Sequence, residues 1–195
     1  MSTLCQDSST THWDRILTTD DIDVPRCDKG IGSVITRPDS PHLLEGVRVE
    51  PLALWPDDRG HFLEVQRVGF GLAAPFSPAT TQISATVTYA DVVKAFHYHL
   101  RQSDCWTVVQ GMLQVALVDM RRHSPTFGQR NTLYVGETRP WQILIPPGVA
   151  HGYKVIGRGS AVLVYVTNQF YDPTDECRIP FDEKRLAYDW STQFK

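Results

Sequence analysis

The chain has 195 residues, with 19 basic and 22 acidic side chains and a formal net charge of -3. Because a surface that binds a phosphate backbone needs an excess of positive charge, this balance argues against nucleic-acid binding. Hydrophobic residues make up 42% of the chain, which is enough for a folded core and too much for disorder. The cysteines form no CxxC pair, which excludes a zinc knuckle. The polar start and the lack of a long apolar run predict a cytoplasmic protein with reduced thiols and no membrane contact.

Composition divides the chain into two parts. Residues 1–45 are rich in Ser, Thr, Asp and Pro, and we expect them to form a partly irregular N-terminal arm. In residues 46–195, short runs of β-branched and aromatic residues alternate with Gly and Pro turns, which is typical of a sandwich, barrel or jelly roll. The strands that we predict there are 47–54, 62–68, 81–88, 92–99, 106–109, 112–119, 131–135, 141–145, 153–156 and 161–167.

Side chains with metal-binding chemistry gather in two segments. His97 and His99 share one face of a predicted strand because side chains alternate along a strand, and Asp104 follows closely. The spacing H-x-H-x4-D-x6-G, followed by P-x-G-x2-H ending at His151, resembles the two-part cupin pattern, in which the acidic residue is usually Glu. Three imidazoles and one carboxylate suit one divalent ion such as Fe, Ni, Mn or Zn. The competing interpretation is a set of separate histidines that are satisfied by hydrogen bonds.

A longer resemblance extends from Gly46 to Trp190. Its segments, in order, are D-D-R-G-H-F-L-E at Asp57–Glu64, K-A-F-H-Y-H at Lys94–His99, Val118–Gly128, I-P-P-G-V-A-H-G-Y at Ile145–Tyr153, and Val164–Pro173. Together they resemble the dTDP-4-dehydrorhamnose 3,5-epimerase family, whose fold is a cupin-type jelly roll, also called a double-stranded β-helix. The resemblance therefore implies an all-β cupin domain over residues 46–195.

The resemblance also implies a function. It predicts an isomerase of deoxysugar biosynthesis that works without a cofactor beside the ketone of a nucleotide-linked 4-keto-6-deoxy sugar. His97 would be the base that removes a proton, and Tyr165 would be the acid that returns it on the opposite face. The substrate-binding positions implied by the resemblance are Arg59, Glu64, Lys94, Tyr171 and His151. Because proteins of this fold commonly pair by strand exchange, we expect a homodimer.

The chain departs from the family's pattern within the site. The family's Gln after His-Tyr is His99 here, and its Lys, which helps to hold the enolate oxygen, is Asp104. The family's Arg is Lys94, which has the opposite strand parity to His97 and reaches the pocket only if the backbone bends. The carboxylate that partners the family's histidine is not evident near the C-terminus.

These departures keep three hypotheses open. The first is the epimerase. The second is a metal-dependent cupin enzyme, an isomerase, cyclase or oxygenase, in which a metal replaces the missing Lys as a Lewis acid. Its ligands would be His97, His99, Asp104 and His151, and the two hypotheses conflict at His97, which cannot be a metal ligand and a free base at once. The third is a non-catalytic cupin that binds a sugar.

Overall fold

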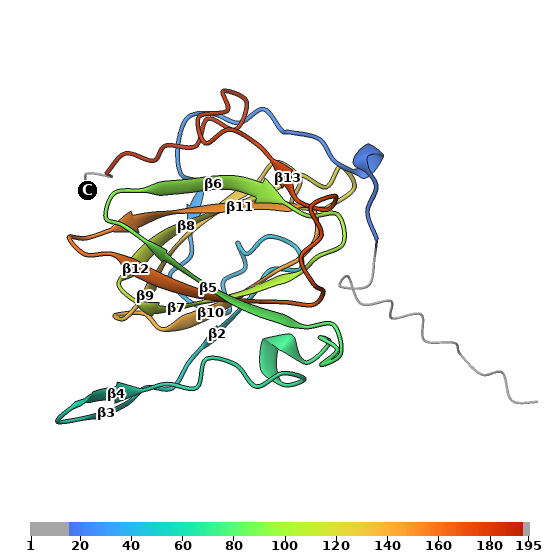
Figure 1. Cartoon of the computed structure of the whole chain (residues 1–195). Coiled ribbons are helices and arrows are strands. Elements are labelled where there is room, and N and C mark those ends of the chain that lie inside the picture. Colours follow the sequence, from blue (N-terminus) through green and yellow to red (C-terminus); the bar gives the residue numbers. More distant parts are fainter. Residues whose placement is uncertain (1–15, 193–195) are drawn as a thin grey trace, which may run out of the picture.

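The computed structural model describes residues 16–192, and nearly all of its regular structure is β (Figure 1). Two short 3-10 helices occur, η1 (Thr19–Asp21) and η2 (Gly71–Ala73). The strands are β1 (Ser33–Val34), β2 (Arg48–Pro51), β3 (Trp55–Asp57), β4 (Gly60–Phe62), β5 (Gln82–Thr88), β6 (Val93–Tyr98), β7 (Asp104–Gln110), β8 (Met112–Asp119), β9 (Arg130–Gly136), β10 (Trp141–Ile145), β11 (Val149–Ile156), β12 (Ala161–Thr167) and β13 (Cys177–Arg178).

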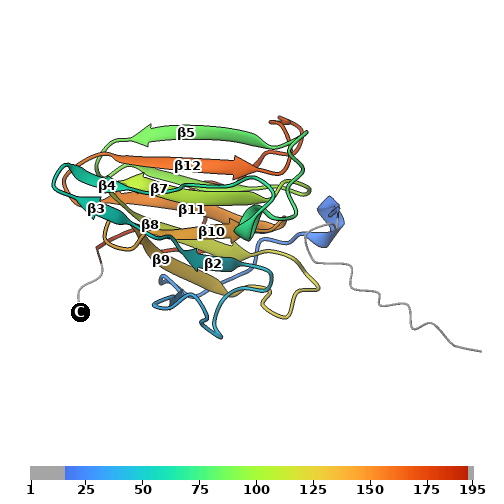
Figure 2. The same cartoon turned by 90° about the horizontal axis from the view of Figure 1, so that it is seen from below.

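Two sheets packed face to face form the body of the molecule (Figures 1 and 2). The six-stranded sheet has the order β1-β9-β8-β11-β6-β13, and the five-stranded sheet has the order β2-β10-β7-β12-β5. Within the described residues, neighbouring strands are antiparallel except for β1 and β9. From β9 to β13, consecutive strands lie in alternate sheets, so the chain crosses back and forth between the two layers. This arrangement confirms the predicted all-β jelly roll.

The core lies between the two sheets, and a second apolar layer lies outside the six-stranded sheet. Strand β8 shows both, because Leu113, Val115 and Leu117 belong to the inner core, whereas Ala116 and Val118 belong to the outer cluster. Segments near the two ends of the described chain cover that outer face, as the blue and red ribbons above β6 and β11 show (Figure 1). Residues on both faces of β8 are therefore buried, which explains its nearly continuous apolar sequence.

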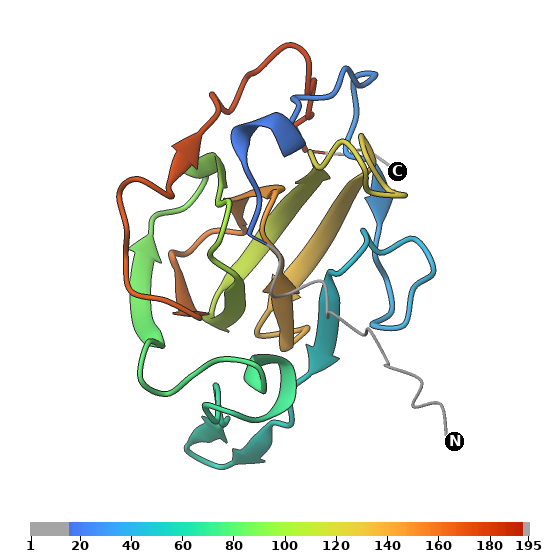
Figure 3. The ribbon, with the colours of Figure 1, turned by 90° about the vertical axis from the view of Figure 1, so that its right-hand side faces the viewer.

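The predicted strand 62–68 is wrong beyond Phe62. Strand β4 ends at Phe62, and its partner is β3, with Trp55 opposite Phe62. This hairpin extends away from the two sheets, at the lower edge of Figure 3. Within the described chain, residues 63–68 therefore have no neighbouring strand to pair with, although their sequence is apolar enough for a strand.

The described part of the predicted N-terminal arm packs on the body. Strand β1 pairs with β9, and both Ile35 and Leu44 belong to the inner core. Residues 1–15 of that arm lie outside the described residues. Among the described residues, no helix has the length and apolar character needed to cross a membrane.

Candidate functional site

A cavity of about 830 Å³ lies between the two sheets. Most of the side chains predicted to form the site line it, namely Lys94, His97, His99, Asp104, Tyr165 and Tyr171. His151 is 2% exposed and lies directly beside His97, with a ring-centroid distance of 4.1 Å. The structure therefore brings together both predicted proton-transfer residues and all four predicted metal ligands.

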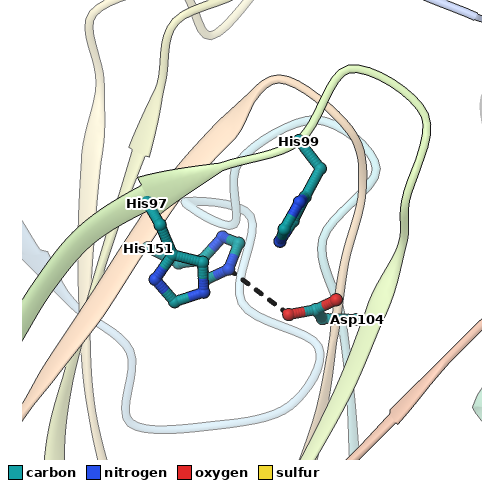
Figure 4. Close-up of side chains that lie close together, drawn as sticks. All are labelled: His97, His99, Asp104 and His151. Atoms are coloured by element: carbon teal, nitrogen blue, oxygen red, sulfur yellow. Dashed lines mark ion pairs between the residues drawn. The ribbon is translucent and has the colours of Figure 1, made fainter. Parts of the chain in front are cut away.

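Strand pairing explains how the histidines and the carboxylate converge. His97 in β6 and His151 in β11 are direct cross-strand partners, so their side chains leave the sheet on the same face. His99 follows just after β6, and Asp104 begins β7 in the facing sheet. Figure 4 shows the four side chains turned toward one another. One potential ligand atom from each lies within 4.8 Å of the others.

Backbone carbonyl groups fix the tautomers of two histidines. The His151 Nδ1–H donates to the Val149 carbonyl at 2.9 Å, and the His99 Nδ1–H donates to the Asp175 carbonyl at 3.0 Å. Because a carbonyl oxygen only accepts, a neutral ring at either position presents a bare Nε2. The His99 Nε2 accepts from Gln102 at 3.2 Å. The His151 Nε2 has no hydrogen-bond partner among the described residues and faces the Asp104 Oδ2 at 3.4 Å (Figure 4).

The interior position of the cluster controls its protonation. Burial of the imidazole and the neighbouring His151 ring hold the pKa of His97 well below its ordinary value of 6.5. Burial also lowers the pKa of His99. Burial alone would raise the pKa of Asp104, but the histidines around it, His151 foremost, outweigh that effect and lower it. Near neutral pH the cluster therefore has neutral rings at His97 and His99 beside an ionised carboxylate.

Two side chains that the sequence analysis did not single out orient Asp104. Its carboxylate accepts from the Gln102 Nε2 at 2.7 Å and from the Trp106 Nε1 at 3.1 Å. Trp106 lies two residues after Asp104 in β7, so strand alternation could have placed it in the cavity wall. Gln102 lies in the loop between β6 and β7, where the sequence carries no such signal.

Asp175 holds the loop that carries His99. Its side chain is buried, and its carboxylate accepts from the backbone N–H groups of Leu100, Arg101 and Gln102. Its backbone carbonyl also accepts from His99. Nothing in the sequence distinguishes Asp175 from the other acidic residues nearby, because the difference is the inward direction of its side chain.

A bulge in β6 brings Lys94 into the cavity. His151 pairs with His97, but Tyr153 pairs with Lys94, so β6 has one more residue than β11 over this stretch. The extra residue reverses the alternation, and Lys94 lines the same cavity as His97. Its Nζ donates to the Thr86 Oγ1 at 2.9 Å. The bend that Lys94 needs to reach the pocket is therefore present.

Tyr165 faces the cavity from the sheet opposite to His97. Strand β12 belongs to the five-stranded sheet, and Tyr165 pairs there with Trp106 of β7. The Trp106 ring lies 6.1 Å from the His97 ring, measured between centroids. Tyr171 lies at the exposed rim, and its hydrogen bond with Glu176 raises its pKa.

The remaining two predicted residues lie away from this cavity. Arg59 is at the turn of the β3–β4 hairpin and forms an ion pair with Asp57. Glu64 follows the hairpin and pairs with Arg67 at 2.8 Å. Both are exposed, and neither lines the cavity of its own chain.

The fold is a jelly roll, and its cavity holds a candidate base and a candidate acid, as an isomerase requires. Comparison with known proteins identifies the family. Residues 42–195 match the sequence model of dTDP-4-dehydrorhamnose 3,5-epimerase. The chain is 41% identical over 155 residues to the spore coat polysaccharide biosynthesis protein SpsL of Bacillus subtilis, covering 78% of this chain and 100% of that protein. It is 37% identical over 153 residues to the probable low-salt glycan biosynthesis epimerase Agl13 of Haloferax volcanii, covering 77% of this chain and 96% of that protein.

Solved structures agree with the sequence matches. This chain superposes on the crystal structure of NovW with a TM-score of 0.67. NovW is a 4-keto-6-deoxy sugar epimerase from the novobiocin biosynthetic gene cluster of Streptomyces spheroides. The match covers 76% of each chain at 28% sequence identity. The chain belongs to the dTDP-4-dehydrorhamnose 3,5-epimerase family. The predicted family, the cupin fold and the isomerase class are confirmed.

Proposed function

We propose that this protein inverts a carbon beside the ketone of a nucleotide-linked 4-keto-6-deoxy sugar. The observation that carries the proposal is that His97 and Tyr165 line one cavity from opposite sheets. Inversion requires a base on one side of the substrate carbon and a proton donor on the other. Membership of the epimerase family, with a similar structure in a 4-keto-6-deoxy sugar epimerase, supports this substrate class.

The reaction needs one proton to leave and one to arrive. The lowered pKa of His97 keeps its imidazole unprotonated near neutral pH, so it can accept the proton from the carbon beside the ketone. The electron pair of the broken C–H bond moves to the ketone oxygen and forms an enolate. The Tyr165 hydroxyl then donates a proton to the opposite face of that carbon, and both side chains are restored by proton exchange with water. The product is a stereoisomer, with no change in oxidation state.

Positive charge near the cavity suits the diphosphate of such a substrate. The ammonium group of Lys94 is in the wall, held by Thr86, and Arg178 lies next to His97 across the β6–β13 pair. We assign the diphosphate to Lys94 and the outer part of the substrate to Tyr171 at the rim. His151 packs against the His97 ring and does not line the cavity, so we assign it no contact with the sugar.

The exposed hairpin favours a homodimer. Trp55 and Phe62 pair on the hairpin with ring centroids 5.6 Å apart, yet they are 55% and 65% exposed. A second copy of the chain that covered them would remove a large apolar area from water. Arg59 and Glu64 lie outside the cavity of their own chain, so their predicted contact with substrate requires the cavity of a partner.

We also propose a cytoplasmic location. Cys27, Cys105 and Cys177 are free thiols. Burial raises the pKa of Cys27, which keeps this thiol protonated and unreactive. Such thiols suit a reducing compartment.

The proposed function is tested with dTDP-4-keto-6-deoxyglucose in heavy water, followed by NMR. We expect deuterium at a carbon beside the ketone and an epimerised product. His97→Gln should lose both, whereas His42→Ala, which changes an exposed histidine outside the cavity, should retain both. Failure of deuterium to enter at high protein concentration would refute the proposal, and tight sugar binding without exchange would favour a non-catalytic sugar-binding protein.

A further inference from the structure

The cluster of His97, His99, Asp104 and His151 has the composition and spacing of a metal site. One donor atom from each residue lies within 4.8 Å of the others, and the donors come from both sheets and a loop. Three imidazole nitrogens with one carboxylate oxygen suit Zn²⁺, Fe²⁺, Co²⁺ or Ni²⁺. The convergence of these donors requires no movement of the strands that carry them.

The groups around the cluster orient its donors. The Nδ1–H groups of His99 and His151 are bound by backbone carbonyls, which directs both Nε2 lone pairs inward. Asp104 is held by an amide and an indole N–H, from Gln102 and Trp106. Ligands of protein metal sites are typically supported in this way by outer hydrogen bonds.

One atom of the cluster lacks the partner that a structural histidine would have. The His151 Nε2 is buried and has no hydrogen-bond partner among the described residues. It lies 3.4 Å from the Asp104 Oδ2, and in the neutral ring, whose Nδ1–H donates to the Val149 carbonyl, its lone pair faces this carboxylate oxygen. Buried polar atoms are nearly always paired, and a cation between these two atoms would give the His151 Nε2 its missing partner.

We propose that His97, His99, Asp104 and His151 bind one divalent transition-metal ion. His99 and Asp104 are also two of the positions at which the sequence departs from the family's pattern, and both departures introduce a side chain that can bind a metal. When bound, such an ion supplies a Lewis acid that can polarise a ketone oxygen.

A bound metal would prevent His97 from acting as the base. This consequence rests on the proposed function, in which His97 removes the proton from the substrate. An imidazole nitrogen that holds a metal has no lone pair left to accept a proton from the substrate. The metal-free and metal-loaded proteins therefore differ at the residue that the proposed epimerisation needs. Metal content and proton exchange are separate measurements, so each proposal can fail without the other.

The test is a titration of the untagged full-length chain with Co²⁺ after treatment with a chelator. We expect a visible absorption band that saturates at one Co²⁺ per chain and disappears on addition of Zn²⁺. Asp104→Asn and His99→Gln keep the side-chain volume but remove a ligand, and each should weaken Co²⁺ binding by about 100-fold or more. His42→Ala, an exposed histidine outside the cluster, should leave affinity and stoichiometry unchanged.

Two results would overturn the metal site. The first is a folded wild-type chain, judged by circular dichroism, that shows no saturable Co²⁺ band. The second is binding that neither folded variant weakens, because the ion would then lie elsewhere. If Asp104→Asn does not fold, His99→Gln decides alone. Deuterium exchange, measured on chelated and Co²⁺-loaded protein, tests only the role of His97 as a base.

Discussion

The Nε2 atom of His151 and the Oδ2 atom of Asp104 oppose each other at 3.4 Å, although they belong to different sheets of the jelly roll. The carbonyl of Val149 fixes the His151 ring, and Trp106 fixes the carboxylate, so neither side chain is free to turn away. This contact lies beside His97, and both His97 and Asp104 line the cavity. One set of strands therefore presents both a base for proton transfer and the donors for a metal.

Replacing Tyr165 with Phe should separate proton removal from inversion. His97 can still remove a proton from the substrate and return it from the same side, so deuterium exchange should persist. The rate at which epimer forms should fall by about 100-fold, because general-acid catalysis from the opposite side is lost. NMR of the substrate in heavy water measures both quantities, and His97→Gln, which should lose both, is the comparison. Epimer formation at the wild-type rate would exclude Tyr165 as the acid.

Removing the Asp175 carboxylate should destabilise the protein. Asp175→Ala leaves the N–H groups of Leu100, Arg101 and Gln102 without their acceptor, at a cost of about 3 kcal/mol in unfolding free energy. Because this loop carries His99, binding of Co²⁺ should weaken as well. Urea unfolding and the Co²⁺ titration measure the two effects.

The matched variant for Asp175 is Asp172→Ala. Asp172 is half-buried and pairs with the partly exposed Arg101, so its loss should cost no more than about 1 kcal/mol. Asp175→Asn keeps an oxygen acceptor and should recover part of the stability. Equal losses for the two alanine variants would show that the loop does not depend on Asp175.

Much of the fold could be predicted because each strand carries its own signal. The bounds of β8, β10 and β12 follow directly from apolar runs between turns. Gly111 marks the turn before β8, where φ is +73° and a Cβ would lie 2.7 Å from the Ser160 carbonyl oxygen. The predicted start of β11 at Tyr153 is wrong, because the strand begins at Val149, and pairing with β8 rather than alternation makes 149–152 a strand.

The site could be predicted only where local spacing determines it. The spacing of His97 and His99 placed both on one face, and the motif added Asp104 and His151. The bulge that turns Lys94 inward depends on how β6 pairs with β11, and short sequence segments do not encode that pairing. For the same reason, the role of Asp175 became visible only in three dimensions.

Mixing two inactive variants should test whether the hairpin serves a partner's cavity. Arg59→Ala and His97→Gln should each lose most activity as homodimers. If Arg59 acts in the partner's cavity, random reassociation should restore about a quarter of the wild-type activity, because half of the dimers then carry one intact site of two. If Arg59 acts in its own chain, every site retains a defect and mixing restores nothing. A monomer by light scattering would contradict the proposed homodimer directly.

Protonation of Asp119, at the end of β8, should lower the stability of the protein at acid pH. Asp119 is fully buried and accepts hydrogen bonds from Arg121, Ser124 and Thr126. Burial alone would raise the pKa of Asp119, but these donors, Arg121 above all, outweigh it and hold the pKa below its ordinary value of 3.8. The native state therefore releases this proton more readily than the unfolded state, so the stabilisation is complete above pH 3.8 and is lost as the pH falls through the lower native pKa.

Asp119→Asn should accordingly cost about 3 kcal/mol in unfolding free energy at neutral pH, because it leaves the Arg121 charge without its buried partner. The difference between wild type and variant should shrink as the pH falls below 3.8 and through the lower native pKa of Asp119, where the wild-type carboxylate also becomes neutral. Urea unfolding across this pH range measures the difference. Asp39→Asn, at an 82% exposed side chain, should stay within about 0.5 kcal/mol of wild type throughout. A cost for Asp119→Asn that does not change with pH would show that the charge of Asp119 makes no contribution and that its shape alone matters.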